Sequence, residues 1–148
     1  MSGFLLDTDV ISMLSSSRTD APPRFLDWLE RMDTEGRIFL CVMSVHEIEK
    51  GIALLENRHA VAKAAALRGW LAGLTTAFAD RILGFDTEVA ALSGRLEALA
   101  LARGADPGMA DAVIAGIAQA QALTIVSRNA KHFRPFGVAV LTPEEVAA

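Results

Sequence analysis

The chain has 148 residues, of which 52% are hydrophobic and 22% charged, and its formal net charge is −4. This composition is typical of one folded domain and excludes a disordered chain. No apolar run approaches the roughly 20 residues that a membrane-spanning helix needs. The apolar start at Phe4 is interrupted at once by Asp7 and Asp9, unlike a signal peptide. We therefore expect a single domain over residues 1–148 that stays in the cytoplasm.

Short apolar runs alternate with amphipathic segments along the chain. The expected strands are residues 4–6, 37–42, 81–85, 123–126 and 138–141. Helices are expected over residues 8–15, 59–78 and 108–121. Further helices are expected to begin at Pro22-Pro23, at Ser44 and at Asp86 or Thr87, the last of these ending at Gly104. A final helical turn is expected after Thr142. This alternation predicts an α/β fold with three α/β/α layers around a short, mostly parallel central sheet.

Polar side chains follow the expected strands. Asp7 comes directly after the first strand, Glu47 lies in the first turn of the helix after the second, and Asn129 follows the strand 123–126. Sites in parallel α/β sheets lie beyond the carboxyl ends of the strands. We therefore expect these side chains to gather at one edge of the sheet, together with Asp9.

Asp111 stands on a largely small and apolar face of its expected helix. A carboxylate there is costly unless it is paired or bound to a cation. Carboxylates are the hard oxygen ligands that Mg²⁺ and Mn²⁺ prefer, and such a metal activates water and neutralises phosphate charge. The pattern therefore predicts a metal site to which Asp111 contributes, if its helix begins at the same edge.

Each acid also has a purely structural explanation, which the sequence leaves open. Asp7 or Asp9 can cap the short helix after the first strand. Ser44 and Glu47 match a capping box, in which the glutamate reaches back to the serine amide. Asp106, before Pro107, is expected to be an ordinary N-cap, so we leave it out of the site.

Cys41 is the only cysteine and lies within an apolar run. This predicts a buried, reduced thiol and excludes an intrachain disulfide. A zinc site is also disfavoured, because His46, His59 and His132 are scattered along the chain.

Four stretches of the chain resemble the motifs of PIN domains, in the order of that family. They are Leu5–Ser12, Ser44–Ile52, Ala110–Ala115 and Val126–Phe133. The resemblance covers essentially the whole chain, and the most similar branch is that of VapC and FitB-like toxins. It implies a PIN-like fold and a Mg²⁺- or Mn²⁺-dependent endoribonuclease. The implied metal ligands are Asp7, Glu47 and Asp111, with Asn129 as a fourth catalytic position.

The resemblance also implies partners. Toxins of this kind are typically homodimers, and a small antitoxin inhibits them by placing its tail in the acidic site. The antitoxin often also binds operator DNA. We therefore expect this chain to associate with operator DNA only through the antitoxin.

This chain departs from the family pattern at two positions. Asp9 stands where the family often has Asn, and Asn129 stands where many members have a fourth acid. The negative net charge also provides no broad basic face for RNA. The expected phosphate contacts are Arg128, Lys131 and Arg134, with Arg18 and Arg24 as further candidates.

Two other functions remain as alternatives. Asp7 and Asp9 also fit the opening signature of haloacid-dehalogenase phosphatases, but the segment Ser127-Arg128-Asn129 lacks the acidic pair which that mechanism needs. The other alternative is a PIN-like module that binds RNA or a partner without cutting, which Asn129 keeps open.

Overall fold

A computed structural model describes residues 2–15 and 20–148. The central sheet has five strands, β1 (Phe4–Leu6), β2 (Ile38–Cys41), β3 (Ile82–Leu83), β4 (Thr124–Val126) and β5 (Val140–Leu141). Every neighbouring pair is parallel, and the strand order is β3-β2-β1-β4-β5. The sheet is thus the parallel one that the alternating pattern predicts, and β1 lies at its centre.

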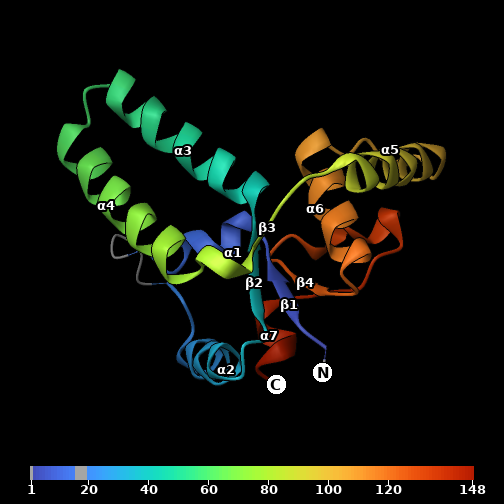
Figure 1. Cartoon of the computed structure of the whole chain (residues 1–148), viewed down its shortest axis with the longest axis horizontal. Coiled ribbons are helices and arrows are strands. Elements are labelled where there is room, and N and C mark those ends of the chain that lie inside the picture. The colour runs from blue at the N-terminus through green and yellow to red at the C-terminus, as the bar shows by residue number, and fades with distance from the viewer. Residues whose placement is uncertain (1, 16–19) are drawn as a thin grey trace.

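Helices cover both faces of this sheet, as Figure 1 shows. They are α1 (Thr8–Ser12), α2 (Pro23–Thr34), α3 (Val42–Asn57), α4 (Val61–Ala77), α5 (Thr87–Ala102), α6 (Met109–Ala120) and α7 (Pro143–Val146). One buried cluster joins the sheet to α5 and α6, and a second joins it to α1, α2, α3 and α4. The predicted three-layer α/β/α fold is therefore confirmed.

Several helix ends have the caps that the sequence predicts. Asp86 begins α5 and accepts a hydrogen bond from the Val89 amide at 2.9 Å. Gly104, just past the end of α5, has a φ of +84°, a left-handed conformation that glycine adopts without strain. Thr142 forms a capping box with Glu145 at the start of α7.

Two predicted caps are wrong. Helix α3 begins at Val42, so Ser44 lies inside its first turn and forms no capping box with Glu47. Helix α6 has Gly108 at its N-cap position and no side-chain cap, so the exposed Asp106 does not cap it. Neither Glu47 nor Asp106 therefore has the capping role that the sequence suggests.

The predicted buried thiol is confirmed, because Cys41 is a buried free cysteine. Phe133 and Phe136 are each 1% exposed in the α5–α6 side of the core. Gly51 is exposed, and an added Cβ there would meet nothing within 4 Å. None of the helices in the described ranges is long and apolar enough to cross a membrane.

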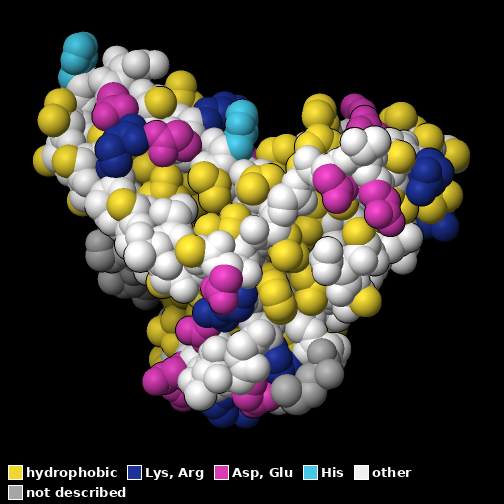
Figure 2. Space-filling model, in the orientation of Figure 1, with side chains coloured by type: hydrophobic (Ala, Val, Ile, Leu, Met, Phe, Trp, Pro, Cys, Tyr) yellow, Lys and Arg dark blue, Asp and Glu magenta, His cyan; other side chains and the backbone are white. Residues whose placement is uncertain are grey.

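The α3–α4 pair and the α5–α6 pair extend from the sheet as two arms. The surface between the arms is hollowed, and hydrophobic side chains gather on it (Figure 2). Leu54 of α3 and Met109 of α6 line one groove and are exposed apolar residues, of which Met109 is 62% exposed. The hollow thus leaves apolar surface uncovered beside the carboxyl ends of the strands.

Candidate functional site

Asp7 lies where the central strand β1 ends, and the backbone and a neighbouring strand hold it there. Its amide donates to the Val126 carbonyl of β4 at 3.0 Å. One carboxylate oxygen, Oδ1, accepts from the Thr8 amide at 2.8 Å, and the other, Oδ2, accepts from the Ser127 hydroxyl at 2.8 Å. Asp7 therefore caps α1, which is one of the two roles that the sequence leaves open. It is also held by the residue that follows β4 and is only 8% exposed.

Burial makes the charge on Asp7 unfavourable. Burial, together with the negative charges of Asp9 and, less strongly, Asp111, raises the pKa of the Asp7 carboxyl from 3.8 to about 7, and the Ser127 and Thr8 hydrogen bonds act in the opposite direction. A carboxylate in this state gains most from a nearby cation. Asp7 is therefore the group around which a cation site would form.

Asp111 joins this cluster because α6 begins at the same edge. Burial raises its pKa, His132 acts in the opposite direction, and the charges of Glu47 and Asp9 raise it again. These interactions bring Asp111 within electrostatic reach of acids from α1 and α3. His132 is a residue that sequence reasoning missed, because its nearness to Asp111 depends on the packing of α6 against the segment after β4.

Glu47 is held by a residue of α1. The Thr8 hydroxyl donates to Glu47 Oε1 at 2.6 Å, and its other hydrogen-bond partner is the Ser44 hydroxyl at 2.9 Å. A hydroxyl–carboxylate bond of this length is short and strong. The first turns of α1 and α3 are thereby tied together, and Glu47 is oriented at the edge where Asp7 lies.

Asp9 and Asn129 meet across the ends of β1 and β4. The Asn129 amide nitrogen Nδ2 donates to Asp9 Oδ2 at 2.9 Å, and the Asn129 backbone amide donates to the Ser127 hydroxyl at 2.9 Å. The second oxygen of Asp9, Oδ1, is buried and has no hydrogen-bond partner within the described ranges. The structure therefore brings together all four predicted site residues and Asp9.

This donor set fits a divalent metal of the hard kind. The available ligands are carboxylate oxygens, and the orphaned oxygen of Asp9 is a position that a cation would satisfy. No group of three His, Cys, Asp or Glu side chains in the described segments is arranged to hold a metal by itself. Mg²⁺ keeps several of its water ligands, so carboxylates that do not reach it directly can still hold it through those waters.

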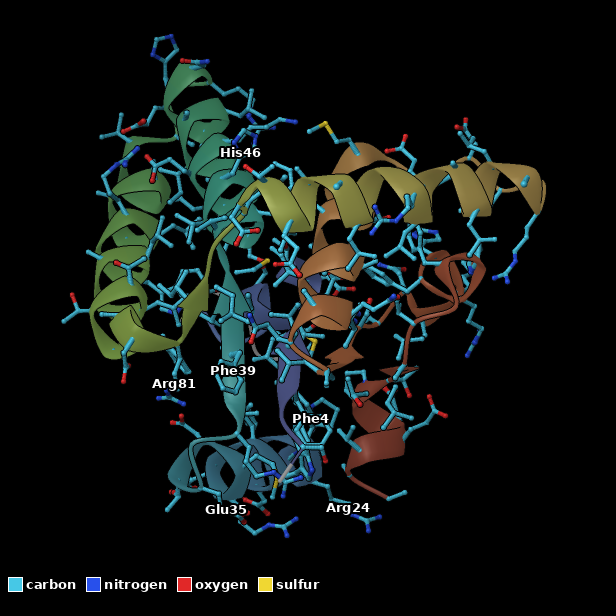
Figure 3. The ribbon with its side chains drawn as sticks, turned by 45° about the vertical axis from the view of Figure 1, so that its right-hand side comes forward. Phe4, Arg24, Glu35, Phe39, His46 and Arg81 are labelled. Carbon is cyan, nitrogen blue, oxygen red and sulfur yellow. The ribbon has the colours of Figure 1, made fainter. Side chains whose placement is uncertain are left out.

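The predicted phosphate contacts that follow β4 are exposed. Arg128 pairs with Asp20 at 3.3 Å, and Lys131 and Arg134 are exposed in the turns that follow, where Arg134 acts electrostatically on Glu145 of α7. Arg24 is at the opposite end of the sheet from His46, which belongs to the first turns of α3 (Figure 3). The structure thus does not bring Arg24 to the site, and Arg18 lies outside the described residues.

Two grooves flank Glu47. The first, of about 600 Å³, runs between α3 and α4, and apolar side chains such as Ile52, Leu67 and Trp70 dominate its lining. The second, of about 450 Å³, lies on the other side of α3 and includes Lys50 and Met109. Glu47 is therefore reached from two sides, and the larger of the two grooves is mainly apolar.

Comparisons with known proteins give consistent similarities. The PIN domain family model matches residues 4–136. Toxin FitB of Neisseria gonorrhoeae is 34% identical over 140 residues, which cover 94% of this chain and 96% of that protein. VapC ribonuclease Y4jK of Sinorhizobium fredii is 29% identical over 144 residues, covering 97% and 99%. The crystal structure of FitAcB from Neisseria gonorrhoeae has a TM-score of 0.81 at 34% identity, covering 95% of this chain and 98% of that one.

Proposed function

The chain belongs to the PIN domain family, and from this we propose that it is a metal-dependent endoribonuclease, a VapC-type toxin that hydrolyses RNA phosphodiester bonds and is neutralised by a cognate antitoxin. A ribonuclease among its relatives supports the activity. The observation that carries the proposal is the acidic cluster at the carboxyl end of β1, in which Asp7 is buried and its pKa is raised to about 7. The phosphatase alternative is wrong, because the PIN match spans residues 4–136.

Asp7, Glu47 and Asp111 are the proposed ligands of Mg²⁺ or Mn²⁺. The bound metal supplies Lewis-acid polarisation of the phosphate and lowers the pKa of a water molecule. The chain itself keeps the ligands in place, since Ser127 fixes Asp7 and Thr8 fixes Glu47. The half-buried position of Asp111 makes its charge more responsive to a cation than that of a solvated acid.

RNA affinity is proposed to come from a few local contacts. Arg128, Lys131 and Arg134 follow β4 in the sequence and are exposed. We add His132, which acts electrostatically on Asp111. Such contacts neutralise phosphates without a broad basic face, which is consistent with the net charge of −4.

The groove between α3 and α4 is the proposed place for the antitoxin. Its lining is mainly apolar, and it extends to Thr8 and Glu47, so a segment bound there would also obstruct the acidic cluster. We further propose a homodimer in the cytoplasm, for which the exposed apolar surface between the arms provides an interface (Figure 2). Operator DNA would then be bound only through the antitoxin.

The test is cleavage of total RNA by the purified chain with Mn²⁺ or Mg²⁺, and again with EDTA. We expect cleavage that EDTA stops and excess metal restores, and that Asp7→Asn abolishes. Asp106→Asn is the matched control, because this acid is exposed and is not a cap. Metal-independent cleavage would overturn the mechanism, and RNA binding without any cleavage would favour the non-catalytic module.

A further inference from the structure

Asp9 occupies an unusual position in the acidic cluster. One oxygen, Oδ2, accepts a hydrogen bond from Asn129 Nδ2 at 2.9 Å. The other, Oδ1, is closed off from solvent and has no hydrogen-bond partner among the described residues. A buried carboxylate oxygen without a donor is strongly disfavoured unless a cation or an ordered water faces it. Asp9 Oδ1 is therefore an atom that a cation could satisfy.

Each oxygen of Asp7 already accepts one hydrogen bond from the protein and keeps only its second lone-pair direction for a metal. Asp7 Oδ1 and Oδ2 accept from Thr8 and Ser127. Asp9 Oδ1, by contrast, is buried and receives no donor from the described residues. The Asp9 carboxylate also acts electrostatically on both Asp7 and Asp111, which come from different elements. Asp9 is therefore positioned among the proposed ligands, with one oxygen free to face a cation.

Asn129 explains how Asp9 keeps this orientation. Its backbone amide is tied to the Ser127 hydroxyl at 2.9 Å, and its side-chain amide donates to Asp9 Oδ2. A carboxylate at position 129 could not donate in this way and would repel Asp9. An amide at 129 and an acid at 9 thus form one unit, in which the amide holds one oxygen and leaves the other open.

We propose that Asp9 is a further ligand of the divalent metal through its Oδ1 atom, and that Asn129 is the positioning residue that orients it. This rests on the proposed function and extends it, because Asn129 then serves the site without ligating the metal. The pair supplies one carboxylate and one amide from the ends of β1 and β4. Metal binding should therefore be retained in the double variant Asp9→Asn with Asn129→Asp, in which the acid and the amide exchange positions.

The experiment is calorimetric titration of Mn²⁺ into the purified, metal-stripped chain without RNA. We expect Asp9→Asn to weaken Mn²⁺ binding by about tenfold or more, and Asn129→Ala to weaken it less. The double exchange Asp9→Asn with Asn129→Asp should recover most of the affinity. Asp106→Asn should bind as the wild type does, and melting temperatures in EDTA identify any variant that is simply unfolded.

The outcomes separate this inference from the proposed function. Wild-type Mn²⁺ binding that is unchanged in Asp9→Asn would overturn the inference and leave the nuclease proposal standing. Binding that depends on Asp9, in a protein that cuts no RNA, would support the inference and contradict the nuclease. An Asn129→Ala variant with unchanged affinity would overturn the positioning role, as would failure of the double exchange to recover binding. A folded wild type without Mn²⁺ binding would overturn both proposals.

Discussion

Replacing Asp7 with asparagine should stabilise the metal-free protein above pH 7, although it removes a proposed metal ligand. Asp7 is 8% exposed, and its pKa rises from 3.8 to about 7 because of burial and the charge of Asp9. One pKa unit corresponds to about 1.4 kcal/mol, so the ionised carboxylate costs the folded chain roughly 4 kcal/mol. Asparagine removes this charge but weakens the bond from Ser127, and we expect a net gain of about 2–3 kcal/mol.

The pH dependence follows from the sign of this shift. Because the pKa of Asp7 is higher in the folded chain than in the unfolded one, the stabilising contribution of the protonated carboxyl is complete below pH 3.8. It is lost as the pH rises through about 7. In EDTA, the free energy of unfolding of the wild type should therefore fall over this interval relative to that of Asp7→Asn.

The assay is urea unfolding in EDTA at a series of pH values across this interval, followed by the fluorescence of Trp28 and Trp70. Asp106→Asn serves as the control, because it removes an exposed acid and should leave the pH profile of the wild type unchanged. Asp7→Asn being less stable than the wild type above pH 7, or the two pH profiles running parallel, would refute the destabilisation that we assign to the ionised Asp7 carboxylate.

Three further changes test the packing, the site and the caps. Gly116→Ala should destabilise the fold by about 1–3 kcal/mol, because the added Cβ would lie 2.9 Å from Ser93 Cβ where α5 packs on α6; an unchanged melting temperature would contradict this contact. Thr8→Val should slow RNA cleavage about tenfold or more, whereas Thr8→Ser should not, because the hydroxyl orients Glu47. Equal cleavage rates in the two variants would exclude the orienting role of the Thr8 hydroxyl. Asp106→Ala should change stability by less than about 0.5 kcal/mol, and a loss of about 1 kcal/mol in urea unfolding would mean that it does cap a helix.

The layers of the fold could be predicted because they depend on local patterns. Apolar runs such as Phe4–Leu6 alternate with amphipathic helices, and this alone specifies a parallel sheet covered on both faces. The capping box at Ser44 shows the limit of such patterns. Its sequence fits, but the chain turns into a helix directly after Cys41, and Glu47 instead accepts a hydrogen bond from Thr8, 39 residues earlier.

The site was predictable to the extent that it follows strand ends. Asp7, Glu47 and Asn129 could be placed from the rule that sites lie beyond the carboxyl ends of parallel strands. The contacts that define their chemistry could not, because they depend on β4 lying beside β1. Ser127 on Asp7 and Asn129 on Asp9 each join residues 120 positions apart.

The catalytic role of the acidic edge is tested by comparing RNA cleavage and RNA binding in the wild type and in Asp111→Asn, both with saturating Mn²⁺. We expect cleavage to fall by a factor of about a hundred or more, while RNA affinity, measured by fluorescence anisotropy, changes little. If Asp111→Asn cuts RNA at the wild-type rate, the acidic edge of the sheet is not the catalytic site.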